Sequence, residues 1–208
     1  MAAAANFIND RHVAALKIVI HMFSLGLLVR AYYLGFSDQL GGDATKAILH
    51  YTGIGALNLL LLTLCISPAS RYFRQAKLIR LRRLLGLYCF LWALAHLVNF
   101  VVFDLQLDAV LLVSELTKRP YIVVGMVTFL ILLALAITSL PVLVRALGRH
   151  WKPLHRLIYV AAVAACIHFY WSVKADVSEA VIYFLAVSFL LFLRVRKRKP
   201  GIRRANTP

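Results

Sequence analysis

The chain consists of long apolar stretches separated by short polar segments. A membrane-spanning helix needs about 20 predominantly apolar residues, and six stretches meet or approach that length. They lie at residues 18–36, 47–66, 84–105, 121–140, 154–173 and 180–195. The pattern predicts an all-α fold, a bundle of six transmembrane helices, that forms one transmembrane domain followed by a basic tail at residues 196–208.

Composition agrees with a membrane protein. Hydrophobic residues make up 62% of the 208 positions, and the mean hydropathy is +0.80. Soluble domains are much less apolar. Residues 1–17 have no apolar core before a cleavage site, so we expect no removable signal peptide.

The charged residues alternate from one connecting segment to the next. Residues 67–83, 141–153 and the tail carry Lys and Arg but no acid. Seven of the eight acids fall in the other segments, at Asp38, Asp43, Asp104, Asp108, Glu115, Asp176 and Glu179. The positive-inside rule therefore predicts that both termini and the basic loops are cytoplasmic. The net charge of +16 then reflects topology and attraction to anionic lipid, and we expect no nucleic-acid partner.

Two histidines carry the strongest indication of chemistry. His96 lies roughly 18 Å along the third predicted span and His168 roughly 21 Å along the fifth, both counted from the cytoplasmic side at 1.5 Å per residue. Two parallel helices thus hold an imidazole at nearly the same depth, in the periplasmic half. That arrangement is typical of axial ligands to one haem b, although each histidine could instead make an interhelical hydrogen bond.

His155 could belong to a second site at the cytoplasmic edge. A partner at the same depth on the third span would fall where Arg82 and Arg83 stand, and arginine does not ligate haem iron. His21 and His150 are possible substitutes. The sequence therefore predicts His155 as a ligand without identifying its partner.

Three segments resemble the MsrQ (YedZ) family, the haem-binding membrane subunits of a periplasmic methionine sulfoxide reductase system within the ferric-reductase-like transmembrane superfamily. They are RRLLGLYCFLWALAHLV (82–98), KRPYIVVG (118–125) and WKPLHRLIYVAAVAACIHFYW (151–171). The resemblance implies that His96, His155 and His168 are associated with haem. Larger members of the superfamily have four such histidines and a cytoplasmic flavin and nicotinamide domain. This chain departs from them in both respects.

The resemblance also implies a redox partnership in the bacterial inner membrane. Such proteins take electrons from the quinone pool, as quinol, or from a separate cytoplasmic flavin reductase. They pass the electrons to MsrP, a periplasmic molybdopterin subunit that reduces methionine sulfoxide in envelope proteins and would form a heterodimer with this chain. We expect no catalysis by the chain alone, and flavin mononucleotide (FMN) as an optional second cofactor.

Several charged or polar residues could contact these cofactors. Arg30 could pair with a haem propionate or with Asp104. Arg119 and Tyr121 could contact propionates, quinol or MsrP, or could anchor the helix at the interface. Arg82 and Arg83 could hold a flavin phosphate or the propionates of a second haem, or could serve only as topogenic charge.

Two other functions fit the same six helices. One is a di-haem, quinone-linked reductase of the cytochrome b561 kind, which needs a second complete histidine pair. The other is a small non-redox transporter whose histidines relay protons or join helices.

Overall fold

The computed structural model describes residues 8–173 and 176–195, and these contain helices and no strands, as the sequence predicts. The α-helices are α1 (Asp10–Phe36), α2 (Ala44–Tyr72), α3 (Arg82–Val98), α4 (Ala109–Lys118), α5 (Pro120–Ile137), α6 (Pro141–Leu147), α7 (Trp151–Leu154), α8 (Leu157–Ser172) and α9 (Ser178–Val195). Shorter helical turns are η1 (Ala76–Leu81), η2 (Asn99–Asp104) and η3 (Gly148–His150). The predicted basic tail at 196–208 lies outside the described residues.

Four helical segments are long and apolar enough to cross a membrane. They are Asp10–Phe36, Ala44–Tyr72, Ala76–Asp104 and Pro120–Ile137. A fifth is obtained if Pro141–Leu154 and Leu157–Ser172, which are bent by 54° at their junction, count as one broken span. The protein is therefore a multi-pass helical membrane protein, whereas the sixth span, at α9, stays a prediction.

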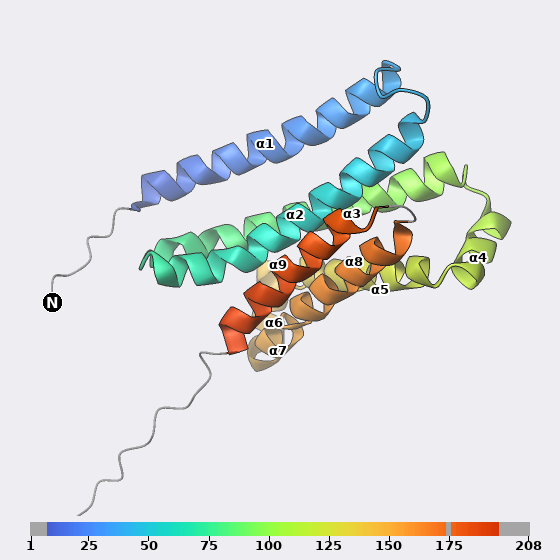
Figure 1. Ribbon diagram of the computed structural model, residues 1–208. Coiled ribbons are helices and arrows are strands. Elements are labelled where there is room, and N and C mark those ends of the chain that lie inside the picture. Colours follow the sequence, from blue (N-terminus) through green and yellow to red (C-terminus); the bar gives the residue numbers. More distant parts are fainter. Residues whose placement is uncertain (1–7, 174–175, 196–208) are drawn as a thin grey trace, which may run out of the picture.

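Two helix pairs form the centre of the bundle. α2 packs along α3, α5 packs along α8, and α9 lies against α8 and α2 (Figure 1). The core where they meet contains small side chains, Cys89, Ala161, Ala162 and Cys166, beside Leu64. Small residues let helix backbones approach closely in a membrane, where lipid tails are as apolar as any side chain.

Helix α1 lies along the outside of this bundle (Figure 1) and is joined to α3 and to the start of η2 by side-chain hydrogen bonds. The pairs are His21 with Tyr88 (2.5 Å), Ser24 with Trp92 (3.0 Å) and Tyr32 with Asn99 (2.8 Å). Because lipid supplies no hydrophobic force for helix association, such bonds, each worth about 1 kcal/mol, are a principal reason that α1 docks here.

The connecting segments lie at two opposite ends of the bundle. The α1–α2 turn, α4 and the last residues of α8 lie at one end of the bundle, and α6, α7 and the α2–α3 turn lie at the other (Figure 1). The first residues of α1 and the last described residues of α9 also lie at this second end. There, Asp10 accepts hydrogen bonds from Lys77 (3.1 Å) and Arg80 (2.6 Å). The sequence analysis did not predict α4, α6 or α7 as helices.

We expect this second end to face the cytoplasm, because it carries the basic segments. Periplasm-active reporter fusions after Asp43, Glu115 and Lys174 should be active, and fusions after Gln75 and Arg198 should be silent. A reporter active only in the cytoplasm should give the opposite pattern. A periplasmic signal after Arg198 would contradict the predicted orientation.

Candidate functional site

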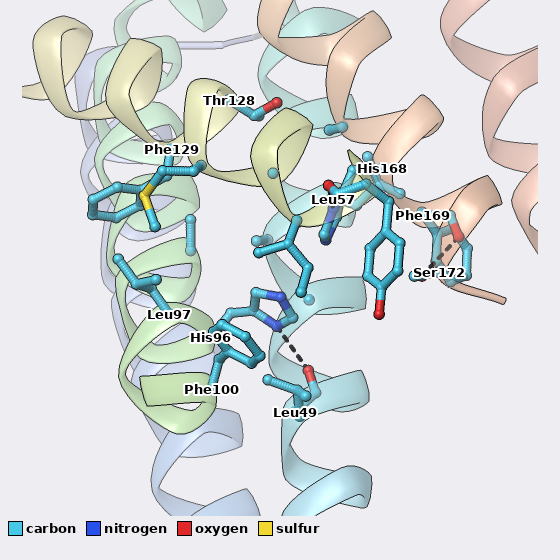
Figure 2. A pocket seen from close by; sticks show the side chains of 18 of the residues that line it. Leu49, Leu57, His96, Leu97, Phe100, Thr128, Phe129, His168, Phe169 and Ser172 are labelled. Carbon is cyan, nitrogen blue, oxygen red and sulfur yellow. Dashed lines mark hydrogen bonds between the residues drawn. The ribbon is translucent and has the colours of Figure 1, made fainter. Parts of the chain in front are cut away.

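A cavity of about 540 Å³ lies between α2, α3, α5 and α8, and both His96 and His168 line it (Figure 2). Most of the remaining wall is apolar, with Leu57 and Phe129 among the larger side chains. Ligand and cofactor sites in proteins typically measure about 300–1,000 Å³ and combine apolar walls with a few polar groups. The cavity has the size and lining of a cofactor site.

The two imidazole rings lie close together in this space, one edge-on to the other. Their centroids are 6.2 Å apart, and their planes are nearly perpendicular, at 84°. Two imidazoles that share one metal ion through bonds of about 2.0 Å have centroids about 6 Å apart. The spacing of His96 and His168 is therefore compatible with two ligands of one ion.

Backbone carbonyls fix the tautomer of both rings. Nδ1 of His96 lies 2.9 Å from the carbonyl oxygen of Leu49, and Nδ1 of His168 lies 2.7 Å from that of Tyr121. A carbonyl can only accept, so Nδ1 carries the proton in each ring. The lone pair of a neutral imidazole is then on Nε2, which is the arrangement that orients histidine for a metal.

Glycines make room for the rings. A Cβ atom at Gly53 would lie 3.0 Å from Cε1 of His96, and a Cβ atom at Gly125 would lie 2.7 Å from Cε1 and Nδ1 of His168. Contacts this short are essentially absent for real Cβ atoms below 3.0 Å and rare just above it. Each ring therefore packs directly on the backbone of the neighbouring helix.

The arrangement of a carbonyl acceptor, a glycine and a histidine occurs twice in the described chain with the same spacing. Each histidine lies 47 residues after its carbonyl partner, and each glycine lies one helical turn after that carbonyl. Carbonyl, glycine and histidine recur 72 positions further on (49 to 121, 53 to 125 and 96 to 168). The α2–α3 and α5–α8 pairs thus present their imidazoles to the cavity in the same way.

Charged and polar groups lie at the rim of the cavity near the α4 end. Lys46, Asp104, Arg119 and Tyr121 all line it. Arg119 donates to the Tyr121 hydroxyl at 3.3 Å and pairs with Glu115 at 2.9 Å. The Tyr121 hydroxyl, followed by the charges of Glu115 and Asp104, holds the pKa of Arg119 above its ordinary value, so this residue stays positive. Cations at a rim suit the carboxylates of a cofactor.

Two basic residues near this end differ from what the sequence predicts. Arg30 is exposed on α1, does not line the cavity and forms no ion pair with Asp104 in the described structure. Lys46, which the sequence analysis missed, lies at the rim instead. His50 also lines the cavity, with its ring centroid 6.1 Å from that of Phe169.

His155 lies elsewhere, at the junction of α7 and α8. Its Nε2 is 3.1 Å from the Thr138 hydroxyl, and its ring stacks on Trp151 at 4.1 Å. The proposed substitutes do not reach it: His21 bonds Tyr88, and His150 is exposed beside Arg149. Within the described chain, then, His155 has no histidine partner, and no group of three or more His, Cys, Asp or Glu could hold a bare metal ion.

Arg82 and Arg83 also lie away from the cavity, at the start of α3. Arg82 is partly buried, and Arg83 is exposed. Adjacent in sequence, they have different environments because successive helical side chains point about 100° apart.

Comparison with known proteins identifies the family. The family described as ferric reductase like transmembrane component matches residues 52–166, from α2 into α8. The protein-methionine-sulfoxide reductase heme-binding subunit MsrQ of Pectobacterium carotovorum is 44% identical over 190 residues, 90% of this chain and 94% of that protein. The chain belongs to the MsrQ family. The MsrQ proteins of Klebsiella pneumoniae (42% over 188 residues, 90% and 93% coverage) and Cronobacter sakazakii (44% over 191 residues, 91% and 96%) are similarly close. No solved structure matches the chain significantly.

The short distance between the backbone at Gly125 and the ring of His168 predicts that a larger side chain at position 125 lowers the stability of the protein. Gly125→Ala should destabilise the protein by about 1–3 kcal/mol, the usual cost of overpacking, because the methyl group displaces His168. Thermal unfolding in detergent measures the change. Gly26→Ala is the matched control, since a Cβ atom there meets nothing within 4 Å. Equal stability of the two variants would contradict the close packing.

Proposed function

We propose that this chain is a haem b electron-transfer subunit of the bacterial inner membrane. It takes electrons from the quinone pool, as quinol, or from a cytoplasmic flavin reductase, and delivers them to an MsrP-like periplasmic molybdoenzyme that reduces methionine sulfoxide. The name of its relatives, the heme-binding subunit of protein-methionine-sulfoxide reductase, supports the redox partnership. The observation that carries the proposal is the pair of closely spaced imidazoles, each oriented by a backbone carbonyl in one cavity.

The residues of the cavity fit haem. His96 and His168 would hold the iron from its two sides, and Lys46 and Arg119 would bind the propionates at the rim. When bound, haem supplies a reversible one-electron change at iron. The protein excludes water with its apolar wall and holds a proton on each Nδ1, which keeps both Nε2 lone pairs directed inward. Two imidazole ligands would suit electron transfer, because they would leave no coordination position for a substrate.

The position of the cavity gives a direction to the transfer. Its rim lies near α4 and the α1–α2 turn, at the end that the charge pattern assigns to the periplasm. Haem there would be close to a soluble periplasmic partner. Electrons enter either from quinol within the membrane or from the other end of the bundle. In the second case, FMN bound at the basic end, near Arg82 and Arg83, would accept them.

The first prediction from this proposal concerns haem content. His96→Ala and His168→Ala should each lose the low-spin haem spectrum and most of the bound haem, because each removes one axial nitrogen. Reduced-minus-oxidised spectra and a haem-to-protein ratio measure this.

His21→Ala is the matched control for these variants. It removes an imidazole from another membrane-spanning helix, but His21 bonds Tyr88 and does not line the cavity. It should keep the wild-type haem spectrum. Wild-type spectra in both His96→Ala and His168→Ala would contradict the assignment of these histidines as haem ligands.

The second prediction concerns electron transfer. The purified protein, reduced anaerobically, should be reoxidised quickly when MsrP and methionine sulfoxide are both added. MsrP alone should take up only a few electrons, and methionine sulfoxide alone should have no effect. Stopped-flow absorbance at the haem bands measures the rate. Sulfoxide reduction without MsrP would contradict the subunit role, and a haem that stays reduced with both present would favour a general quinone-linked cytochrome.

A further inference from the structure

Asn99 is a polar side chain buried where α1, α2 and the end of α3 meet, with 1% of its surface exposed. It lies three residues after His96 and begins η2, where the helix widens into a π-helix. Short π-helical turns frequently lie at functional sites. Burying an amide is costly unless its donors and acceptors are paired, so the partners of Asn99 indicate its role.

The amide of Asn99 joins α1 to α2. The Tyr32 hydroxyl donates to its Oδ1 at 2.8 Å, and its Nδ2 donates to the hydroxyl of Thr52 at 3.2 Å. Thr52 is fully buried. Its own proton is directed to two backbone carbonyls of α2, that of Ile48 at 2.8 Å and that of Leu49 at 3.1 Å. Every member of this network therefore has a partner.

The network ends on the acceptor of a candidate ligand. The Leu49 carbonyl oxygen also accepts the Nδ1 proton of His96, at 2.9 Å (Figure 2). Thr52 and His96 therefore donate to the same oxygen, and two donors on one oxygen each bind it more weakly than one donor does. Hydrogen bonds in a chain polarise one another, so a change at Tyr32 or Asn99 reaches the imidazole through the Thr52 hydroxyl.

The network is present on one side of the cavity only. The 72-residue offset that relates His96 to His168 relates Thr52 to Val124, which has no hydroxyl. Among the described residues, no side-chain hydroxyl donates to the Tyr121 carbonyl, the acceptor of His168. The two histidines thus have the same orientation but differ in what controls their acceptor.

We propose that Thr52 and Asn99 are positioning residues that set the ligand strength of His96, and through it the redox potential of the haem. The potential part of this inference rests on the proposed function. Donation from Nδ1 to a carbonyl makes an imidazole a stronger ligand, and a stronger axial ligand favours ferric over ferrous iron. Because the Thr52 hydroxyl occupies part of the Leu49 carbonyl, it weakens that donation and keeps the potential higher.

The first test removes one member of the network at a time. Thr52→Val keeps the side-chain shape and should raise the ferric to ferrous ratio at a fixed applied potential about tenfold, a fall of 59 mV for a one-electron couple. Asn99→Leu and Tyr32→Phe should lower the potential by progressively less, since each is one hydrogen bond further away. Thr52→Ser restores the hydroxyl and should restore the wild-type potential. Redox titration of the purified protein, followed at the haem bands, measures each value.

Two variants control for structural effects. Thr63 lies on the same helix as Thr52 and its hydroxyl makes the same kind of bond, to the Leu59 carbonyl at 2.8 Å, but it does not line the cavity. Ser24 accepts a hydrogen bond from Trp92 and so joins α1 to α3 without touching the network. Thr63→Val and Ser24→Ala should both keep the wild-type potential.

The second test observes the hydrogen bond itself. Proton NMR of the full chain labelled with ¹⁵N-histidine, in the reduced and diamagnetic state, detects the Nδ1–H of each buried imidazole. In Thr52→Val the His96 resonance should move downfield, as a stronger hydrogen bond requires, and the His168 resonance should not move. Thr63→Val should leave both unchanged. This measurement does not need haem, so wild-type protein that binds none would refute the proposed function and would still allow the network to be tested.

Several results would overturn the proposal. They are an unchanged or raised potential in Thr52→Val, an equal fall in Thr52→Ser or Thr63→Val, and an unmoved His96 resonance. Equal shifts of the His96 and His168 resonances would also overturn it, because they would indicate general loosening of the bundle. If Asn99→Leu does not fold, Thr52→Val and Tyr32→Phe decide the outcome, since each removes only a hydroxyl group or replaces it with a methyl group.

Discussion

The hydrogen bond from an imidazole Nδ1 to a backbone carbonyl of the next helix is the contact on which the candidate site depends. It orients each ring, fixes its proton and joins α3 to α2 and α8 to α5. In a bilayer no water competes for that carbonyl, and a buried polar group without a partner is expensive. The same contact that satisfies the histidine inside an apolar bundle therefore prepares its other nitrogen for a metal.

The same constraint accounts for polar contacts far from the cavity. Side-chain hydrogen bonds attach α1 to α3, because neighbouring lipid gives α1 no hydrophobic reason to dock. Pro68 removes a donor from α2, and Arg194 replaces it at the Leu64 carbonyl. These polar side chains thus each satisfy a specific backbone or side-chain group.

Depth along a helix was enough to pair His96 with His168, because 1.5 Å per residue relates position to level in the membrane. It could not show which face each ring occupies or which backbone it touches. The repeated Gly–His spacing of 43 residues (53 to 96 and 125 to 168) was a usable signal that the sequence analysis missed. Lys46 was missed because a lysine at a helix start is an ordinary interfacial residue. Helix α4 was missed because a ten-residue segment between two spans is usually a loop. The bend between α7 and α8 was missed because apolar composition does not indicate a change in helix direction.

The repeat also explains why a second imidazole pair does not form at the other end. The 72-residue offset that relates His96 to His168 relates position 83 to position 155, so Arg83 is the counterpart of His155. Arg83 is exposed, and the Nε2 of His155 bonds the Thr138 hydroxyl while its ring stacks on Trp151. The described residues therefore build one complete pair, near the proposed periplasmic exit. An electron that starts at the cytoplasmic face needs a carrier other than a second bis-histidine haem, whereas quinol, which diffuses within the bilayer, can approach the single pair directly.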